Sequence, residues 1–266
     1  GQVVDQNRQS IANRSSVVVH PASVYVGLRT PRSVVKAGQP LKVAAIVATI
    51  DGKRVAGKAL TIRALQLRSK MTPVKQGGEW TYEYETREVE ITRCDVTSAA
   101  DPASCALTLP KPGMYLVRAE VKDARGRLAR TTVTVYAHGP GYVPWRLKNQ
   151  SRIELVPDRQ EYRPGDVARV LVKSPLRDAR GFFTLSRSGI ARHELLHMQG
   201  NARVMEIKIK EEHIPGIHVG VALARGRIKV PGAKPGARDL GRPTLAHGTV
   251  KLAVSSASKR VQVEVQ

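Results

Sequence analysis

Short apolar runs separated by turn residues follow one another along nearly the whole chain. Runs of about four to eight residues that are rich in Val, Ile, Tyr and Thr are typical of β-strands. In the first half we expect strands at residues 17–19, 23–27, 41–50, 59–67, 80–91, 105–109, 114–121 and 129–135. Asp51-Gly52 predicts a hairpin to the next run, and Lys111–Gly113 and Asp123–Gly126 predict further turns. This density of strands predicts an all-β fold in which antiparallel sheets form a sandwich.

The same pattern resumes after a Gly/Pro-rich stretch from His138 to Trp145. We expect further strands at residues 153–156, 167–172, 181–186, 190–198, 204–209, 217–224, 249–254 and 261–265. Both halves open alike, because Val34–Val43 and Gln160–Val170 each combine extended chain, a glycine turn and an alternating strand. The repeat predicts tandem copies of one sandwich.

The predicted strands divide the chain into four parts. These are 1–19, the end of a preceding domain or a linker; 20–137, a β-sandwich; 138–152, a linker; and 153–266, a second β-sandwich with a long loop at 225–248. That loop is rich in Gly, Pro, Arg and Lys, and loops of its length are usually functional or mobile. We expect it to be the first segment that an added trypsin-like protease cuts.

The chain carries a large excess of positive charge, since 44 Lys and Arg residues face 22 Asp and Glu residues and give a net charge of +22. Such an excess attracts polyanions. The basic residues are scattered, however, and Phe182 and Phe183 lie together in an apolar run, so no basic stacking platform is evident. We interpret the charge first as a solvated surface, then as a contact with membrane or envelope polyanions, and expect no specific nucleic-acid partner.

The sequence has no long uncharged apolar run and no secretory signal at its start. It begins at Gly1 without a Met and stops within the alternating run Val261–Gln266. We therefore expect the chain to be a piece of a longer polypeptide.

Two cysteines, Cys94 and Cys105, flank a turn-rich stretch that could return as a hairpin with the two sulfurs facing each other. A disulfide is the preferred interpretation, and two free buried thiols are the alternative. A disulfide would place the protein outside the reducing cytosol.

The run from His193 through Glu194 to His197 matches the H-E-x-x-H pattern of zinc peptidases. That chemistry needs a helix, in which residues i and i+4 share one face. Here the pattern lies in an alternating run between glycines, and four residues of strand span about 13 Å, too far for two ligands of one zinc. Arg203 also stands where the longer motif has its third histidine. We expect no metal, no cofactor and no catalytic residue, so the protein is not expected to be an enzyme.

A second near match is Gly52–Ala59, which resembles a phosphate-binding loop but ends in Ala59 where Ser or Thr would bind magnesium. The residues that follow read as a strand and not as the helix that such a loop requires. We expect this segment to bind no phosphate.

Eight short segments of the sequence, taken together and in order, resemble bacterial alpha-2-macroglobulins. They are Val17–Arg29, Lys36–Leu41, Gly113–Ala119, Asp123–Arg127, Gly141–Trp145, Ile153–Asp158, Tyr162–Arg169 and Lys173–Pro175. The resemblance covers the chain from Asp5 onward and implies macroglobulin-like sandwiches of the immunoglobulin or fibronectin kind. The Cys94 and Cys105 pair is similar to a disulfide hairpin of these bacterial proteins.

The resemblance implies a scaffold fragment of a broad-spectrum endopeptidase inhibitor that traps proteases. In such proteins a protease cuts a bait segment, and a Cys-to-Gln thioester is released to capture it. This chain has no thioester, because Thr97 and Thr108 stand three residues after the cysteines. By position we expect the bait to follow Gln266 and the 225–248 loop to be an ordinary exposed loop.

The implied partners are proteases, bound through the full-length parent, and neighbouring macroglobulin-like domains. The implied location is the bacterial periplasm or cell envelope, with a membrane-anchored lipoprotein as one form of the parent and the anchor outside this chain. Two alternatives stay open: an immunoglobulin-like adhesion or binding module of the envelope, and, more remotely, a zinc peptidase using His193, Glu194 and His197.

Overall fold

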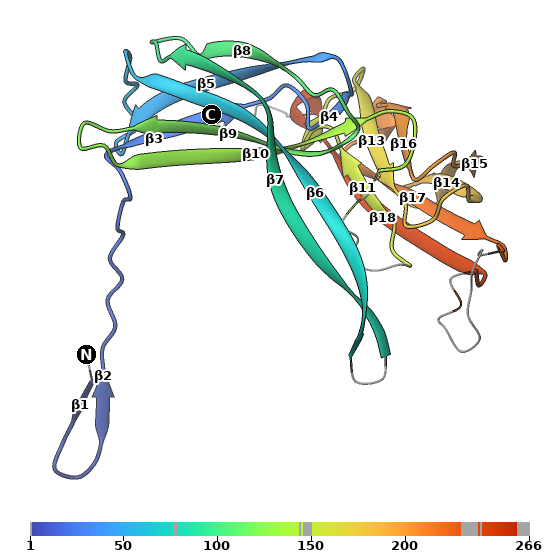
Figure 1. Cartoon of the computed structure of the whole chain (residues 1–266), viewed down its shortest axis with the longest axis horizontal. Helices are drawn as coiled ribbons and strands as arrows, with labels where there is room; N and C mark the ends of the chain where they lie inside the picture. The colour runs from blue at the N-terminus through green and yellow to red at the C-terminus, as the bar shows by residue number, and fades with distance from the viewer. Residues whose placement is uncertain are drawn as a thin grey trace, which may run out of the picture.

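The computed structural model describes residues 2–76, 79–143, 145, 151–229, 239 and 241–259, and it shows two β-sandwiches that follow one another along the chain (Figure 1). The strands of the first sandwich are β3 (Val24–Arg29), β4 (Val34–Lys36), β5 (Pro40–Thr49), β6 (Ala59–Gln76), β7 (Glu79–Thr97), β8 (Ala103–Thr108), β9 (Gly113–Lys122) and β10 (Leu128–His138). The strands of the second are β11 (Glu154–Pro157), β12 (Glu161–Tyr162), β13 (Val167–Lys173), β14 (Arg180–Ser186), β15 (Ile190–His197), β16 (Ala202–Lys208), β17 (Gly216–Arg225) and β18 (Thr244–Val254).

The first sandwich packs a three-stranded sheet, β3-β5-β8, against a five-stranded sheet, β4-β10-β9-β6-β7. Strand β5 shows why the sequence folds this way, because Leu41, Val43, Ala45 and Val47 alternate with more exposed residues and all four lie in the core. This period of two is what a sheet with one buried face requires.

The second sandwich repeats the topology of the first, with a sheet β11-β13-β16 facing a sheet β12-β18-β17-β14-β15. In each unit a short strand pairs in parallel with the last strand: β4 with β10, and β12 with β18. In each unit a glycine with positive φ, Gly38 or Gly165, then turns the chain into the next strand. The predicted all-β fold and the tandem copies are confirmed.

Several details differ from the sequence-based expectation. Strands β6 and β7 are much longer than predicted and extend as one hairpin beyond the sandwich (Figure 1). The predicted strand at 17–19 is exposed chain without a ladder partner, whereas a small exposed hairpin of β1 (Gln2–Val4) and β2 (Ser10–Ala12) was not predicted. The predicted strand at 261–265 lies outside the described residues.

The Asp51-Gly52 turn does not join β5 and β6 as a hairpin. The turn reverses the chain, and an isolated bridge between Ala48 and Arg54 forms across it, flanked by backbone bonds from Thr49 to Lys53 and from Val55 to Val47. The next residues carry the chain to the opposite sheet, where β6 pairs with β7 and β9. The physical reason is that a turn fixes a reversal but not the length of the ladder that follows it.

An apolar junction joins the two sandwiches. Its centre is Trp145 of the linker, which is 6% exposed and packs in one cluster with Val34 of β4 and Leu171 of β13. The surrounding residues of this cluster are Met114, Tyr136, Val143, Val156, Ala202 and Val204. Leu171 lies between the core residues Val170 and Val172, so β13 is buried on both faces. The outer face of the β11-β13-β16 sheet in the second sandwich thus packs against the linker and the first sandwich.

Lys173 lies at this junction with only 4% of its side chain exposed. Its ammonium group bonds to a carboxylate oxygen of Glu154 at 2.7 Å and stands 4.8 Å from the ring centre of Tyr136 and 5.1 Å from that of Trp145. A buried lysine is tolerated only with such compensation. The lysine therefore binds the second sandwich to an aromatic pair contributed by the first sandwich and the linker.

Backbone and carboxylate bonds hold a second part of the junction. The amide of Ser33 donates to the carbonyl of Asp158 at 3.0 Å, and its hydroxyl donates to the carbonyl of Pro157 at 2.9 Å. The buried Asp158 carboxylate accepts the Tyr162 hydroxyl at 2.8 Å and faces the Arg32 guanidinium at 3.6 Å. Burial, and then this carboxylate, raise the pKa of Tyr162.

The linker itself is fixed by Asn201. Its side-chain oxygen accepts the amide of Val143 at 2.9 Å, and its nitrogen donates to the carbonyl of the same residue at 2.8 Å. Of the predicted linker, residues 144 and 146–150 lie outside the described residues. In the part of the chain that is described, no helix is long and apolar enough to cross a bilayer.

Asp123 closes the β9–β10 hairpin and ties it to the start of β3. Its carboxylate accepts the amides of Ser23, Arg125 and Arg127 and the Arg127 guanidinium, at 2.8 to 3.1 Å. These bonds, first that from Ser23, lower the pKa of Asp123 well below its usual value. The stability that the carboxylate contributes is present above the unfolded pKa of about 3.9 and is lost as pH falls toward the folded value.

We therefore predict that Asp123→Asn lowers the melting temperature at pH 7, and that its difference from the unmodified protein shrinks as pH falls below about 4. Thermal unfolding followed by circular dichroism across this range measures the effect. Asp101→Asn, at an exposed site, is the control. A difference that stays constant with pH would contradict the role assigned to the ionised carboxylate.

Candidate functional site

Cys94 and Cys105 form a disulfide with their Cα atoms 6.6 Å apart. They do not lie on the paired strands of one hairpin as predicted. Cys94 is on β7 and Cys105 is on β8, which are edge strands of opposite sheets. The bond therefore closes one side of the first sandwich. Strands β15 and β16 hold the same places in the second sandwich, where no disulfide is possible because the chain has only these two cysteines.

The H-E-x-x-H residues lie on a strand, as predicted. His193, Glu194 and His197 belong to β15, the edge strand of its sheet, and both histidines are exposed. Four residues of strand separate the histidines by about 13 Å. Among the residues that the structure describes, no three His, Cys, Asp or Glu side chains are gathered so that they could hold a metal ion.

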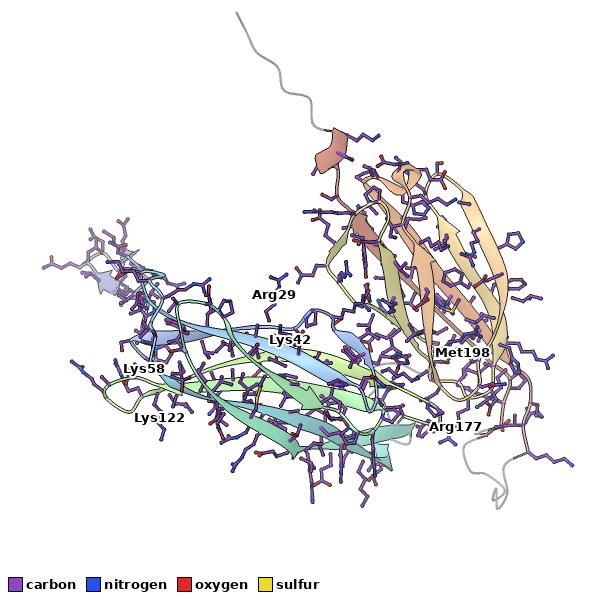
Figure 2. All side chains as sticks on the ribbon, turned by 90° about the horizontal axis from the view of Figure 1, so that it is seen from above. Arg29, Lys42, Lys58, Lys122, Arg177 and Met198 are labelled. Carbon is purple, nitrogen blue, oxygen red and sulfur yellow. A yellow bond between two sulfur atoms is a disulfide. The ribbon has the colours of Figure 1, made fainter. Side chains whose placement is uncertain are left out.

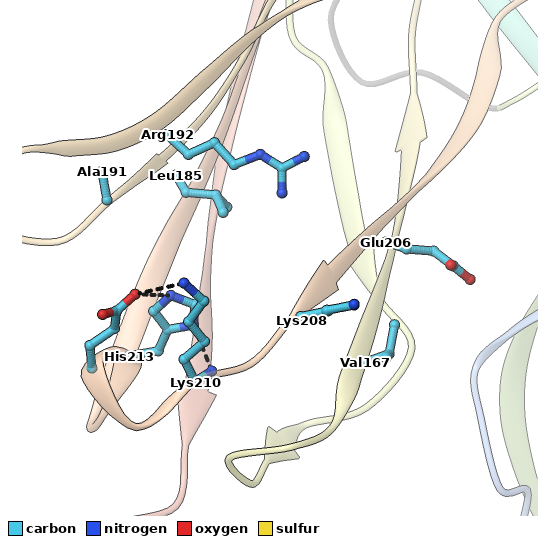
Figure 3. Close-up of a pocket in the computed structure, with 9 residues that line it drawn as sticks. Val167, Leu185, Ala191, Arg192, Glu206, Lys208, Lys210 and His213 are labelled. Atoms are coloured by element: carbon cyan, nitrogen blue, oxygen red, sulfur yellow. Dashed lines mark hydrogen bonds and ion pairs between the residues drawn. The ribbon is translucent and has the colours of Figure 1, made fainter.

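A pocket of about 550 Å³ lies next to β15 but does not gather this motif (Figure 3). Ala191 and Arg192 of β15 line this pocket, whereas His197 lines a different pocket. Most charged groups of the described wall pair with one another or with neighbours, as Arg192 does with Glu194 and Glu206 with Arg169. Lys210 and His213 face the Glu212 carboxylate at 3.3 and 3.8 Å. Burial lowers the pKa of His213, which favours its neutral form.

The near match to a phosphate-binding loop is also not followed by a helix. Its last residue, Ala59, begins strand β6. Gly52 and Gly57 occupy turns with positive φ. The expectation of a strand after this segment is confirmed.

Basic side chains spread over both sandwiches, as Arg29, Lys42, Lys58 and Lys122 illustrate on the first (Figure 2). Some pair with acids on neighbouring strands, such as Arg118 with Glu88 at 2.9 Å. The Glu88 pKa is lowered chiefly by its hydrogen bond from Arg118. This distribution supports a solvated surface.

The predicted 225–248 loop connects the adjacent strands β17 and β18 and is shorter than expected. Strand β18 begins at Thr244, so residues 244–248 belong to the sheet. Gly248, the last residue of the predicted loop, lies inside the β17–β18 ladder. It is needed there because a side chain would collide with the backbone of Ile153. Residues 230–238 and 240 lie outside the described residues.

Hydrogen bonds close the stem of this loop. The amide of Ile228 donates to the carbonyl of Gly241 at 3.0 Å, and the guanidinium of Arg227 donates to the Asp239 carboxylate at 2.8 Å. That hydrogen bond lowers the pKa of Asp239. The stem is exposed and basic, with Arg227, Lys229 and Arg242. It offers side chains that trypsin-like enzymes recognise, at the end of a firmly paired hairpin.

The junction was not predicted as a unit from the sequence. Trp145 was assigned to a linker because Gly and Pro surround it. One available signal was the continuous apolar run Val170-Leu171-Val172, which indicates a strand buried on both faces. A second signal was the charged residue Lys173 directly after that run.

Two tandem sandwiches of one topology define a modular β-protein, and two family models match them in turn. The model described as bacterial macroglobulin domain 6 matches residues 27–139. The model described as alpha-2-macroglobulin bait region domain matches residues 153–266. The chain belongs to the bacterial alpha-2-macroglobulin family.

One curated relative and two solved structures show how much of a longer protein this chain corresponds to. An alpha-2-macroglobulin homolog from Nostoc sp. (strain PCC 7120 / SAG 25.82 / UTEX 2576) is 26% identical over 225 residues, which are 84% of this chain and 12% of that protein. The native E. coli alpha-2-macroglobulin structure aligns with 96% of this chain and 17% of its own, at 16% identity and a TM-score of 0.41. A Salmonella alpha-2-macroglobulin reacted with methylamine aligns with 96% of this chain and 16% of its own, at 16% identity and a TM-score of 0.40. The chain thus spans a small part of the proteins it resembles.

The match to the bait region domain bears on one expectation. We expected the bait to follow Gln266, but the domain that carries this description covers residues 153–266. The placement of the bait beyond Gln266 was based only on the order of the sequence segments that resemble the family.

The zinc question has a direct test. We predict that the purified protein, after dialysis, holds no stoichiometric zinc, because His193 and His197 stand too far apart on β15 to share one ion. Elemental analysis measures the metal, with His193→Ala as the comparison. Bound zinc that is lost in this variant would contradict the assignment.

Proposed function

We propose that this chain serves a bacterial protease inhibitor in two ways: as part of its rigid frame, and as the carrier of the loop that an attacking protease cuts. The observation that carries the proposal is the coincidence of the bait-region-domain match with a basic segment between β17 and β18 whose described flanks, residues 226–229 and 242–243, are exposed. The sequence alone led us to expect a passive scaffold, and this proposal adds a loop that a protease cuts. The assembled inhibitor, and not this chain by itself, would bind and trap the protease.

The placement of the loop suits such a role. Strands β17 and β18 pair from Gly216 with Ala253 to Arg225 with Thr244, and β17 also pairs with β14. Cutting the loop would leave these ladders intact. Cleavage would therefore free two chain ends at the tip of a stable sandwich, and the frame would keep its shape while the freed ends move.

The proposal includes the surroundings of the chain. We assign residues 20–137 and 153–266 to two domains joined by a linker at 138–152, with 1–19 as a linker or the end of a preceding domain. Separate apolar cores in the two sandwiches support this division. Neighbouring macroglobulin-like domains of the parent would contact them.

The disulfide supports a location in the periplasm or at the cell envelope, since such bonds persist in oxidising compartments. A membrane-anchored parent, with its anchor outside this chain, fits that location. We assign no catalytic activity to the chain and no specific nucleic-acid partner.

We predict that limiting trypsin first cuts the chain after Arg227, Lys229 or Arg238. The bonds after Lys234 and Arg242 precede prolines, which trypsin-like enzymes resist. The triple variant Arg227→Gln/Lys229→Gln/Arg238→Gln should lose intact chain several-fold more slowly. Mass spectrometry of early digests locates the first cut.

The matched control, Lys53→Gln/Arg54→Gln, removes two cations from an exposed turn of the first sandwich and should leave the rate unchanged. The isolated chain in molar excess should leave trypsin fully active toward a large protein substrate, because tight inhibition needs a pre-organised insert, and a Gly/Pro-rich segment is cut without holding the enzyme. A first cut within β11 to β16 would contradict the proposal, and so would equal rates for the triple variant and the unmodified chain.

A further inference from the structure

A second pocket, with a volume of about 480 Å³, lies where the long β6–β7 hairpin leaves the first sandwich beside the junction. Its size falls within the range of ligand-binding clefts. Trp145, Met114, Val143 and Leu67 supply an apolar wall. The pocket therefore combines residues of the first sandwich and the linker, and Lys173 adds the second sandwich.

The charges that line this pocket are all positive among the residues that the structure describes. They are those of Arg68, Lys111 and Lys173, and no Asp or Glu belongs to the described wall. Lys173 is already compensated by Glu154. Within the described part of the chain, Arg68 donates only to the neutral side chain of Gln66, at 3.0 Å, and both Arg68 and Lys111 are exposed. Two cations are thus free to meet an anion from outside.

The local structure holds these groups in place. The hydroxyl of the buried Tyr115 donates to the carbonyl of Lys111 at 2.8 Å and fixes the turn that carries this lysine. Gln66 is 9% exposed and orients the Arg68 guanidinium. Trp145 has a buried indole N–H without a partner in the described ranges, and such a donor favours a ligand that brings an acceptor.

We propose that this junction pocket binds an acidic peptide segment, with a carboxylate between Arg68 and Lys111 and a neighbouring apolar side chain against Trp145. The occupant to which we commit is a segment of the parent protein outside this chain, since the chain spans only 12% of its relative from Nostoc. Charge complementarity selects the carboxylate, and the apolar wall selects a peptide over a free anion. The inference does not depend on the proposed cleavage of the β17–β18 loop.

The test uses the fluorescence of Trp145 in the full chain. The chain has two tryptophans, so Trp80→Phe leaves Trp145 as the sole reporter. The probe is the blocked peptide acetyl-Leu-Glu-Leu-amide, compared with acetyl-Leu-Gln-Leu-amide and with sodium acetate. We expect a saturable change in emission with the Glu peptide at concentrations up to about 10 mM, and weaker binding of the Gln peptide and of acetate.

Substitutions then locate the site. Arg68→Gln and Lys111→Gln should each weaken binding about three- to tenfold. Lys122→Gln, at an exposed cation on the far end of β9, should not (Figure 2). Unchanged far-ultraviolet circular dichroism checks the fold of each variant. Equal binding of the Glu and Gln peptides, no binding of either, binding of acetate as tight as that of the Glu peptide, or an equal loss in Lys122→Gln would each overturn the proposal.

Discussion

The burial of the Trp145 ring between two β-sandwiches is the interaction on which the rest of this structure depends. Tandem domains move relative to each other unless their interface is apolar and well packed. Here Val34, Leu171 and Trp145 form one buried cluster, and Lys173 joins it through two aromatic rings and the Glu154 carboxylate. The outer face of β11-β13-β16, which water would otherwise cover, becomes the surface that fixes the second sandwich to the first.

This junction lets two copies of one topology take different roles. The first sandwich is closed at one side by the Cys94–Cys105 bond between its two sheets. The second has no such bond and carries the basic loop between two central strands of its sheet. In a protein that a protease is to cut, this separation has a physical advantage. In the proposed role, the loop that would be cut lies at the end of a hairpin, while the contacts that hold the frame lie far from it in sequence.

Much of the fold could be predicted from sequence, because the alternation in β5 and the glycine turns at Gly38 and Gly165 are local signals. Non-local features were missed. Strands β4 and β12 are only three and two residues long, and each exists because a last strand about 100 residues later offers a parallel partner. The path of the chain after Asp51-Gly52 and the role of Trp145 likewise depend on contacts far along the sequence. The disulfide was predicted from turn residues, but its place between two sheets was not.

The central claim is that the junction makes the two sandwiches one rigid unit, and the distance between them tests it most directly. Spin labels on cysteines introduced at Lys122 and Ile190, both exposed and on different sandwiches, report this distance by electron double resonance while the native disulfide stays intact. The account predicts one narrow distance distribution, which broadens in Trp145→Ala and not in Phe182→Ala, whose half-exposed ring lies outside the junction cluster. A broad distribution in the unmodified protein, or a narrow one that Trp145→Ala leaves unchanged, would contradict it.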